Sequence, residues 1–182
     1  MAFSSGKYYP EVAAGKVLIG STAAAGTAFP VSTGTAVTFG LWNTNPAKNA
    51  ALLWMNVGYT SGTIALGEVG IANQYVGFNI ATGAAMTAFT SGTPKNAYVG
   101  VGQGSSMSFT PSGATLAAGG SALAWSGYSI ESATAGLGIF QCRCDFDGSI
   151  LVPPGQIVFL CGSVAQTGLF TASLAWAEID IN

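Results

Sequence analysis

No stretch of this sequence keeps an apolar face at helical spacing for more than two turns, because Gly, Thr, Ser or Val interrupts every window. Short apolar or alternating runs are abundant instead, and clusters of Gly, Ser, Thr, Asn and Pro separate them. Strands of this kind between regularly spaced turns are typical of a sandwich or barrel. The pattern therefore predicts an all-β, single-domain fold with less than about a tenth of the residues in helix.

The positions of the strands follow from the turn-forming residues that separate them. We expect them at Lys16–Ser21, Thr35–Trp42, Ala50–Tyr59, Thr63–Ala72, Tyr75–Ile80, Ala97–Val101, Ser106–Phe109, Ala122–Ser129, Gly138–Phe146, Gln156–Gly162 and Phe170–Ile181. Residues 1–15 precede the first strand and are expected to form an N-terminal arm. Residues 16–182 then make up one β domain, which suits a chain of 182 residues.

The clearest strand runs through residues 140–147, where apolar and polar side chains alternate. One face would carry Phe140, Cys142, Cys144 and Phe146, and the other would carry Gln141, Arg143, Asp145 and Asp147. We expect the first face in the core and the second in water or at an interface. Asp147-Gly148 then predicts a tight turn.

The last two strands predict how the sandwich closes. Residues 157–161 are apolar without alternation, as expected where both faces of a strand are covered. In the final strand Phe170, Leu174 and Trp176 share a face with Ala172, and the phase changes near Glu178, where we expect a bulge or a new neighbour. This last strand can pair with one from early in the chain. Such pairing predicts an antiparallel Greek-key sandwich of the jelly-roll type.

Charge is unusually scarce in this chain. Only 7% of the residues are charged, against about a quarter in a typical soluble domain. The surface must therefore be built from Ser, Thr, Gly, Ala, Asn and Gln, which give up water more easily than ions do. This composition favours association with further copies or with a larger particle, most simply as a trimer. The alternative is a monomer with a neutral, hydroxyl-rich surface.

Several classes of partner are disfavoured by the same composition. The five cations are spread along the chain and the formal net charge is −2, so no basic patch is available for direct nucleic-acid binding. No apolar run is long enough for a transmembrane helix, so no membrane partner is expected. The N-terminal residues lack the pattern of a Sec signal peptide.

The three cysteines, Cys142, Cys144 and Cys161, form an odd set that fits synthesis in a reducing cytoplasm. Cys142 and Cys144 would lie two apart on one strand face and are poorly placed to bridge each other. A bridge from Cys161 to either of them is left open.

Little catalytic chemistry is available. The chain has no His, which removes the common nucleophile–base systems and His metal sites, so we expect no enzyme, no catalytic residue and no cofactor. Asp145 and Asp147 are weak candidates for a hard cation such as Ca²⁺, and the alternative is a solvated strand end balanced by Arg143. The four Trp residues could line a sugar platform, although their apolar neighbours favour core packing.

Three stretches together resemble a known group of proteins. They are LWNTNPAKN (41–49), VGYTSGT (57–63) leading to residues 67–72, and GSILVPPG (148–155) with the terminal ASLAWAE (172–178). The set resembles small jelly-roll structural proteins of tailed phages and related viruses. The resemblance implies a single jelly roll, trimeric like tumour-necrosis-factor-type knobs, in a decoration, cement or fibre-knob role, and it carries over no catalytic residue.

The function expected from these observations is a non-enzymatic structural protein of a virus particle that self-assembles through charge-poor surfaces. Its partners would be further copies of itself and other virion proteins. It would be made in the host cytoplasm and reside in the virion. The alternative is a carbohydrate-binding β-sandwich module of a cell-surface or virion adhesin.

Overall fold

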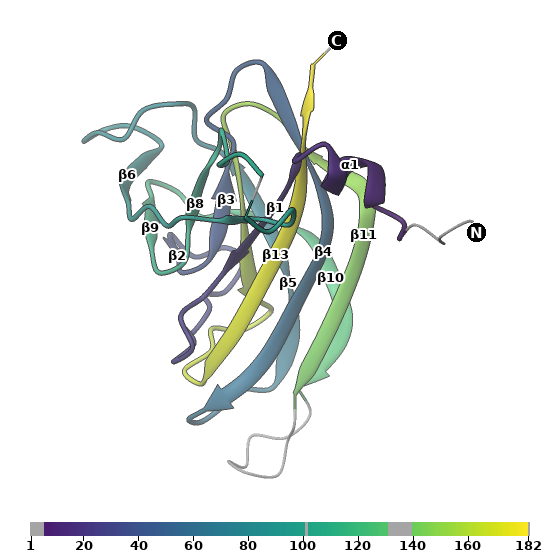
Figure 1. Cartoon of the computed structure of the whole chain (residues 1–182). Coiled ribbons are helices and arrows are strands. Elements are labelled where there is room, and N and C mark those ends of the chain that lie inside the picture. Colours follow the sequence, from purple (N-terminus) through teal and green to yellow (C-terminus); the bar gives the residue numbers. More distant parts are fainter. Residues whose placement is uncertain (1–5, 101, 131–139, 182) are drawn as a thin grey trace.

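The computed structural model of the chain describes residues 6–100, 102–130 and 140–181. In this part of the chain the antiparallel strands form two large sheets that pack face to face, with a small third sheet on one side (Figure 1). The only helix of the described residues is the five-residue α1 (Tyr9–Ala13). The predicted all-β, antiparallel, sandwich-like fold is therefore confirmed.

The first sheet, sheet A, has five strands. Their order is β11 (Gln141–Val152), β4 (Lys48–Ser61), β13 (Leu169–Asp180), β1 (Val17–Ser21) and β7 (Lys95–Asn96). The second, sheet B, also has five strands. Their order is β10 (Ser121–Ile130), β5 (Gly67–Tyr75), β12 (Gln156–Gly162), β3 (Gly40–Trp42) and β8 (Ser108–Thr110). The small sheet C contains β2 (Ala36–Val37), β9 (Ala114–Leu116) and β6 (Met86–Phe89) in that order.

Most consecutive long strands of this chain lie in opposite sheets, the exception being β5 and β10, which pair in sheet B. From β3 to β4 to β5 the chain passes from sheet B to sheet A and back, and from β10 to β13 it changes sheet at every step. Strands that are neighbours in sequence therefore pack across the core, and strands that pair in a sheet come from distant parts of the chain. The folding of either sheet thus depends on the other.

The main core lies between sheets A and B and is rich in aromatic rings. Trp176 is fully buried and stacks on Phe109 at 6.0 Å between ring centroids, and Phe109 meets Phe39 edge to face at 5.3 Å. Phe170 packs in the same core against Phe29 at 4.6 Å. These contacts join strands from both sheets to the loops that connect them.

The apolar run of β12 is buried on both faces, as predicted. Val158 and Leu160 belong to the main core. Ile157, Phe159 and Cys161 belong to a second apolar cluster that also contains residues of sheet C. Sheet C therefore covers the outer face of sheet B at this point, which explains why the strand lacks alternation.

The C-terminal strand β13 occupies the centre of sheet A, between β4 and β1. The predicted inward face of Phe170, Leu174 and Trp176 is confirmed, because all three belong to the main core. The pairing with an early strand is confirmed as well. The new neighbour expected near Glu178 is confirmed: Glu178 stays buried in phase with Trp176, and Ile179 lies on the opposite face, where it packs against an apolar cluster outside sheet A.

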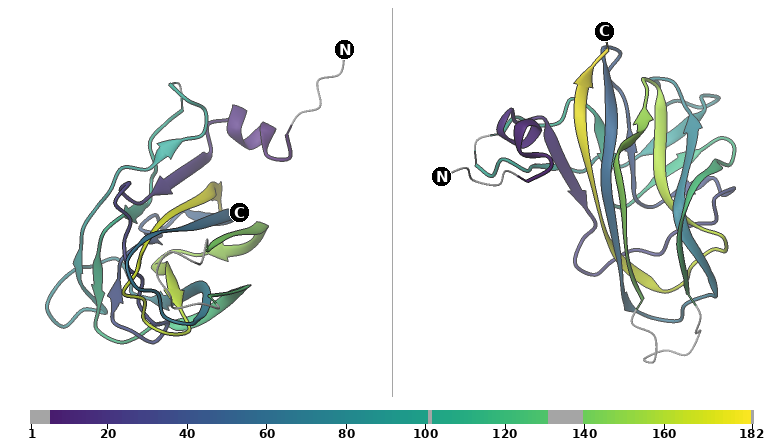
Figure 2. Two further views of the ribbon diagram at one scale, coloured as in Figure 1. Left: turned by 90° about the horizontal axis from the view of Figure 1, so that it is seen from below. Right: turned by 90° about the vertical axis from the view of Figure 1, so that its right-hand side faces the viewer.

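Outward-facing residues of sheet A support the N-terminal segment. Ala175 and Ala177 of β13 lie in a third apolar cluster, against which Tyr8 and Val12 pack. Figure 2 shows α1 outside sheet A, on the side away from sheet B. The described part of the expected arm, residues 6–15, thus lies against the upper half of this sheet.

The alternation predicted for residues 140–147 is confirmed by the burial of β11, and the chain turns at Asp147-Gly148 as predicted, but the turn lies within one strand and does not end it. β11 continues to Val152 and pairs with β4 on both sides of an irregularity between Asp145 and Ile150. Asp147 and Gly148 have φ of 54° and 80°, so they form a bulge within one strand.

Short strands were the least predictable part of the fold. Sequence analysis missed Met86–Phe89 and Ala114–Leu116, which are strands because they pair with each other and cover sheet B. The strand expected at residues 75–80 is not formed. Tyr75 is instead the last residue of β5, and Gly77, with a φ of 69°, turns the chain. The expected strand at 97–101 is absent from Ala97–Gly100, while Val101 lies outside the described residues.

Replacing Trp176 tests whether β13 is a core strand. Trp176→Ala should lower the free energy of unfolding by about 3–5 kcal/mol, because a fully buried ring is removed from a packed core. Ser173→Ala, on the opposite face of the same strand, should cost about 1 kcal/mol or less. Urea unfolding of both variants measures the difference. If both substitutions lowered the free energy of unfolding by the same small amount, β13 would be a detachable segment.

Candidate functional site

The two carboxylates singled out as cation candidates are each held by a cation of the chain itself. Asp145 receives the Arg143 guanidinium, with Nε at 2.9 Å and Nη2 at 2.9 Å from Oδ1. Asp147 forms an ion pair with Lys7 and accepts a hydrogen bond from the Tyr8 hydroxyl. Within residues 6–100, 102–130 and 140–181, no group of three or more His, Cys, Asp or Glu side chains is placed to hold a metal ion.

Asp147 is therefore the contact point of the N-terminal segment. The bulge carries this carboxylate out from β11 toward Lys7 and Tyr8. The Lys7 ammonium and the Tyr8 hydroxyl lower the pKa of Asp147 below its ordinary value. Partial burial and the hydrogen bond to Asp147 raise the pKa of Tyr8 to about 12. The contact ties residues 7–8 to a strand 139 residues further along the chain.

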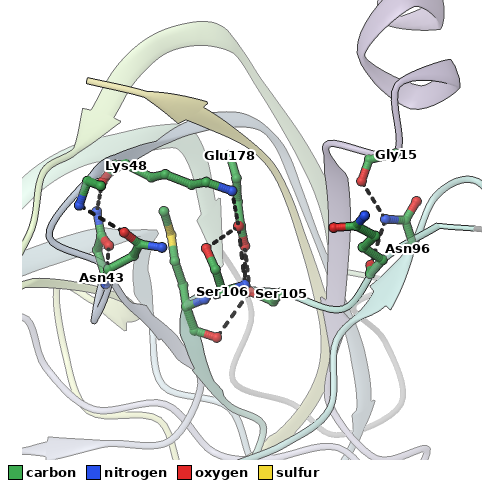
Figure 3. Close-up of polar contacts among 11 residues, drawn as sticks. Gly15, Asn43, Lys48, Asn96, Ser105, Ser106 and Glu178 are labelled. Carbon is green, nitrogen blue, oxygen red and sulfur yellow. Dashed lines mark hydrogen bonds and ion pairs between the residues drawn. The ribbon is translucent and has the colours of Figure 1, made fainter. Parts of the chain in front are cut away.

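A buried carboxylate that sequence analysis missed lies at the end of β13 (Figure 3). Glu178 Oε1 accepts hydrogen bonds from the Ser105 hydroxyl at 2.6 Å and from the Ser106 amide at 3.0 Å. Oε2 accepts one from the Ser106 hydroxyl and lies 3.8 Å from Lys48 Nζ. Both carboxylate oxygens are thus satisfied, and Glu178 acts as an anchor for the chain segment before β8.

One signal in the sequence could have revealed Glu178. It follows Phe170, Leu174 and Trp176 in strict alternation, so the regular pattern already placed its side chain on the inner face. A carboxylate at such a position requires donors, and Lys48 is supplied by the neighbouring strand β4. The two serines come from a loop more than seventy residues away, and no local pattern indicates them.

Two asparagines complete the polar framework drawn in Figure 3. The Asn96 amide donates to the carbonyl oxygens of Gly15 at 2.7 Å and Gln103 at 2.9 Å. The fully buried Asn43 donates to the carbonyl oxygens of Lys48 at 2.7 Å and Val152 at 2.8 Å. Each links chain segments that are distant in sequence. These groups hold loops in place and leave no reactive atom free.

The tryptophans divide between core and surface. Trp42 and Trp176 are buried, and Trp54 is half-buried beneath the Arg143 guanidinium, which lies 5.1 Å from the ring centroid. Trp125 on β10 is 41% exposed. The expected core packing is therefore confirmed for Trp42 and Trp176. The exposed ring of Trp125 lies on a strand at the margin of sheet B.

The three cysteines carry free thiols. Cys142 faces the main core, whereas Cys161 faces the cluster beneath sheet C, so β12 separates them. The bridge left open for Cys161 is therefore absent. Burial raises the pKa of the Cys161 thiol to about 12, and the hydrogen bond to Cys144 together with burial raises that of Cys142. Both are core thiols rather than nucleophiles.

The margin of the sandwich formed by β10 and β11 carries exposed apolar side chains. Each of these strands ends its sheet and pairs on one side only in the described part of the chain. A groove of about 340 Å³ lies there, lined by Asn73, Leu123, residues 149–153, Gln156 and Val158. None of these residues is charged, and Leu123 and Leu151 are 44% and 50% exposed. We call this feature the edge groove.

Comparison with known protein families, with curated protein sequences and with solved structures gave no match for this chain. Among the described residues, the one helix is far too short to span a membrane.

Removing the charge of Glu178 tests the anchor. Glu178→Gln should lower the free energy of unfolding by about 1–3 kcal/mol, because an amide nitrogen then faces donors that the carboxylate satisfied. The Ser106 amide should exchange its hydrogen faster. Asp180→Asn, an exposed acid on the same strand, is the matched control and should change neither quantity. Unchanged exchange at Ser106 in Glu178→Gln would contradict the anchoring role.

The contact at Asp147 predicts a pH window for docking of α1. Because the pKa of Asp147 is lowered by folding, its contribution is present above the ordinary value of 3.8 and is lost as the pH falls through the lowered value. Because the pKa of Tyr8 is raised, its contribution is complete below the ordinary value of 10.0 and is lost as the pH rises through about 12. The methyl NMR signals of Val12 and Ala13, whose protons do not exchange with water, should report undocking at both extremes.

Asp147→Asn provides the control for this window. The variant should lose the acid transition in these signals, since no carboxylate remains to be protonated at that position. An acid transition that persists unchanged in Asp147→Asn would show that another group governs docking of α1.

Proposed function

We propose that this chain is a single jelly-roll domain and a non-enzymatic structural subunit of a virus particle, which self-associates through the edge groove. The strand order supports the jelly roll. If β1, β3, β4, β5, β10, β11, β12 and β13 are numbered one to eight, the two sheets read 6-3-8-1 and 5-4-7-2. This is the order produced by two interleaved Greek keys, an architecture found in viral capsid proteins and lectins.

Self-association is supported mainly by the composition of β10. A strand at the margin of a sheet leaves one row of backbone N–H and C=O groups unpaired, and monomeric proteins usually protect it with Lys or Pro. β10 contains neither, nor any other charged residue, and its pairing with β5 has two irregularities, one between Ala122 and Ala124 and one between Trp125 and Ser129. Its exposed Leu123 and Trp125 add apolar area to this margin. These features suit burial against another copy of the chain.

The neighbouring edge strand supports the same proposal. Leu151 on β11 is exposed at the groove opposite Leu123, and the groove between them is uncharged. Burial of these side chains would remove apolar surface from water without stripping ions. A closed trimer would use one such heterologous contact per subunit and cover this margin in every copy.

Sedimentation velocity at micromolar concentration tests the assembly. The purified chain should sediment as a trimer, and Leu151→Asp should shift it to monomer, because a carboxylate would be buried in the contact. Leu66→Asp is the matched control, since Leu66 is similarly exposed, at 54%, and does not line the groove. A monomeric wild-type chain, or equal effects of both variants, would refute assembly through this surface.

Whether the subunit is part of a virus particle requires a separate measurement. Particles purified from a culture that produces this chain should contain it in stoichiometric amounts by mass spectrometry after density-gradient centrifugation. A chain found only in the soluble fraction would refute the virion assignment while leaving self-association intact.

A further inference from the structure

Gly58 lies in the interior of β4, a central strand of sheet A, where glycine weakens a strand and often marks a close approach to a ligand. Its φ is not in the left-handed region. A methyl group built on it would lie 3.5 Å from Thr171 Oγ1, an ordinary contact. At Gly20 and Gly40, by contrast, a side chain would collide with Phe109 and with β12. Neither backbone conformation nor packing therefore requires glycine at position 58.

The missing side chain leaves a hollow on the outer face of sheet A. In the strand register Gly58 is flanked by Gln141 and Thr171, and the next row along the face places Asn56 between Arg143 and Ser173. These residues line a shallow hollow of about 500 Å³. We call it the Gly58 hollow.

The Gly58 hollow lies on the part of sheet A that α1 leaves uncovered. The helix lies at the upper half of the sheet, and no other described segment lies in front of the lower halves of β4, β13 and β11 in the view of Figure 1. At the rim stands Tyr128 of β10, which is 50% exposed. A ligand in the hollow would therefore have polar groups beneath it and an aromatic ring at its side.

The side chains of the hollow carry almost no uncompensated charge. Arg143 is the one cation among its lining residues, and the bidentate contact with Asp145 neutralises it. Asn56, Gln141, Thr171 and Ser173 supply amide and hydroxyl groups, which both donate and accept hydrogen bonds. This chemistry gives no preference for an ion, and it matches a ligand whose own groups are hydroxyls.

The backbone beneath the hollow is not available to a peptide. β4 pairs with β11 on one side and β13 on the other, so its N–H and C=O groups are already used at Gly58. An added strand would find no free partners here. Recognition must pass through the side-chain amides and hydroxyls, and the volume of the hollow is in the range of small-molecule sites.

We propose that the Gly58 hollow binds a neutral oligosaccharide. The amides of Asn56 and Gln141 pair with adjacent sugar hydroxyls, and the ring of Tyr128 contacts the C–H face of a pyranose. This activity does not depend on the virion assignment, and it uses a different surface from the edge groove.

A printed array of defined neutral, sialylated and sulfated oligosaccharides provides the first test, with the purified full chain as the probe. Neutral members should be bound, and titration calorimetry with the best of them should give a measurable affinity. Gly58→Val should weaken that affinity at least tenfold, because the new side chain fills the hollow in a strand that accommodates a β-branched residue. Thr60→Val, an exposed position of the same strand outside the hollow, should leave it unchanged.

Three results would overturn the proposal. The first is that no neutral oligosaccharide binds at millimolar concentration. The second is that Gly58→Val, with the far-UV spectrum and unfolding of the wild type, binds sugar as well as the wild type does. The third is a change of oligomeric state in Gly58→Val without effect on sugar binding, which would make this face a contact between copies. Loss of trimerisation in Leu151→Asp with retained sugar binding would separate this activity from self-association and support it.

Discussion

The central position of β13 is the constraint on which most other features of this molecule depend. Its pairing with β4 and β1 joins the beginning of the chain to its middle. Its inward side chains fill the main core, and its outward Ala175 and Ala177 form the surface on which Tyr8 and Val12 pack. At its end Glu178 fixes the segment that leads into β8. One strand therefore couples sheet A to sheet B, to α1 and to a distant loop.

The burial of Trp176 in this arrangement also makes one unfavourable contribution to the free energy of folding. The indole N–H of Trp176 is buried without a partner among the described residues, which costs about 1–3 kcal/mol. A Trp side chain buries about 150–250 Å², and at about 25 cal/mol per Å² this contributes roughly 4–6 kcal/mol. Packing therefore outweighs the unpaired donor, and the stack on Phe109 adds to it. The core tolerates the loss of one hydrogen bond because ring area dominates.

Sequence patterns predicted the long strands because alternation and burial act along each strand. Gln156–Gly162 was placed with its observed bounds for this reason. The same patterns could not separate a hairpin from a bulge at Asp147-Gly148, since both use residues that accept positive φ. That choice depends on β4, which is long enough to continue pairing with β11 beyond the bulge. The donors to Glu178 were equally hidden, because tertiary contact alone brings Ser105 and Ser106 to it.

The scarcity of charge affects both the ion pairs within the chain and the chemistry of its exposed surfaces. Three of the five cations, Lys7, Lys48 and Arg143, form ion pairs within the chain. Charge here serves to hold a terminal segment, a loop and an edge strand, and little remains to produce a long-range field. A neutral surface cannot steer partners over distance, so selection must come from shape and hydrogen bonding at contact. The edge groove and the Gly58 hollow are two places where these neutral strands offer such shape, and they differ in kind: leucines line the first, and amides and hydroxyls line the second.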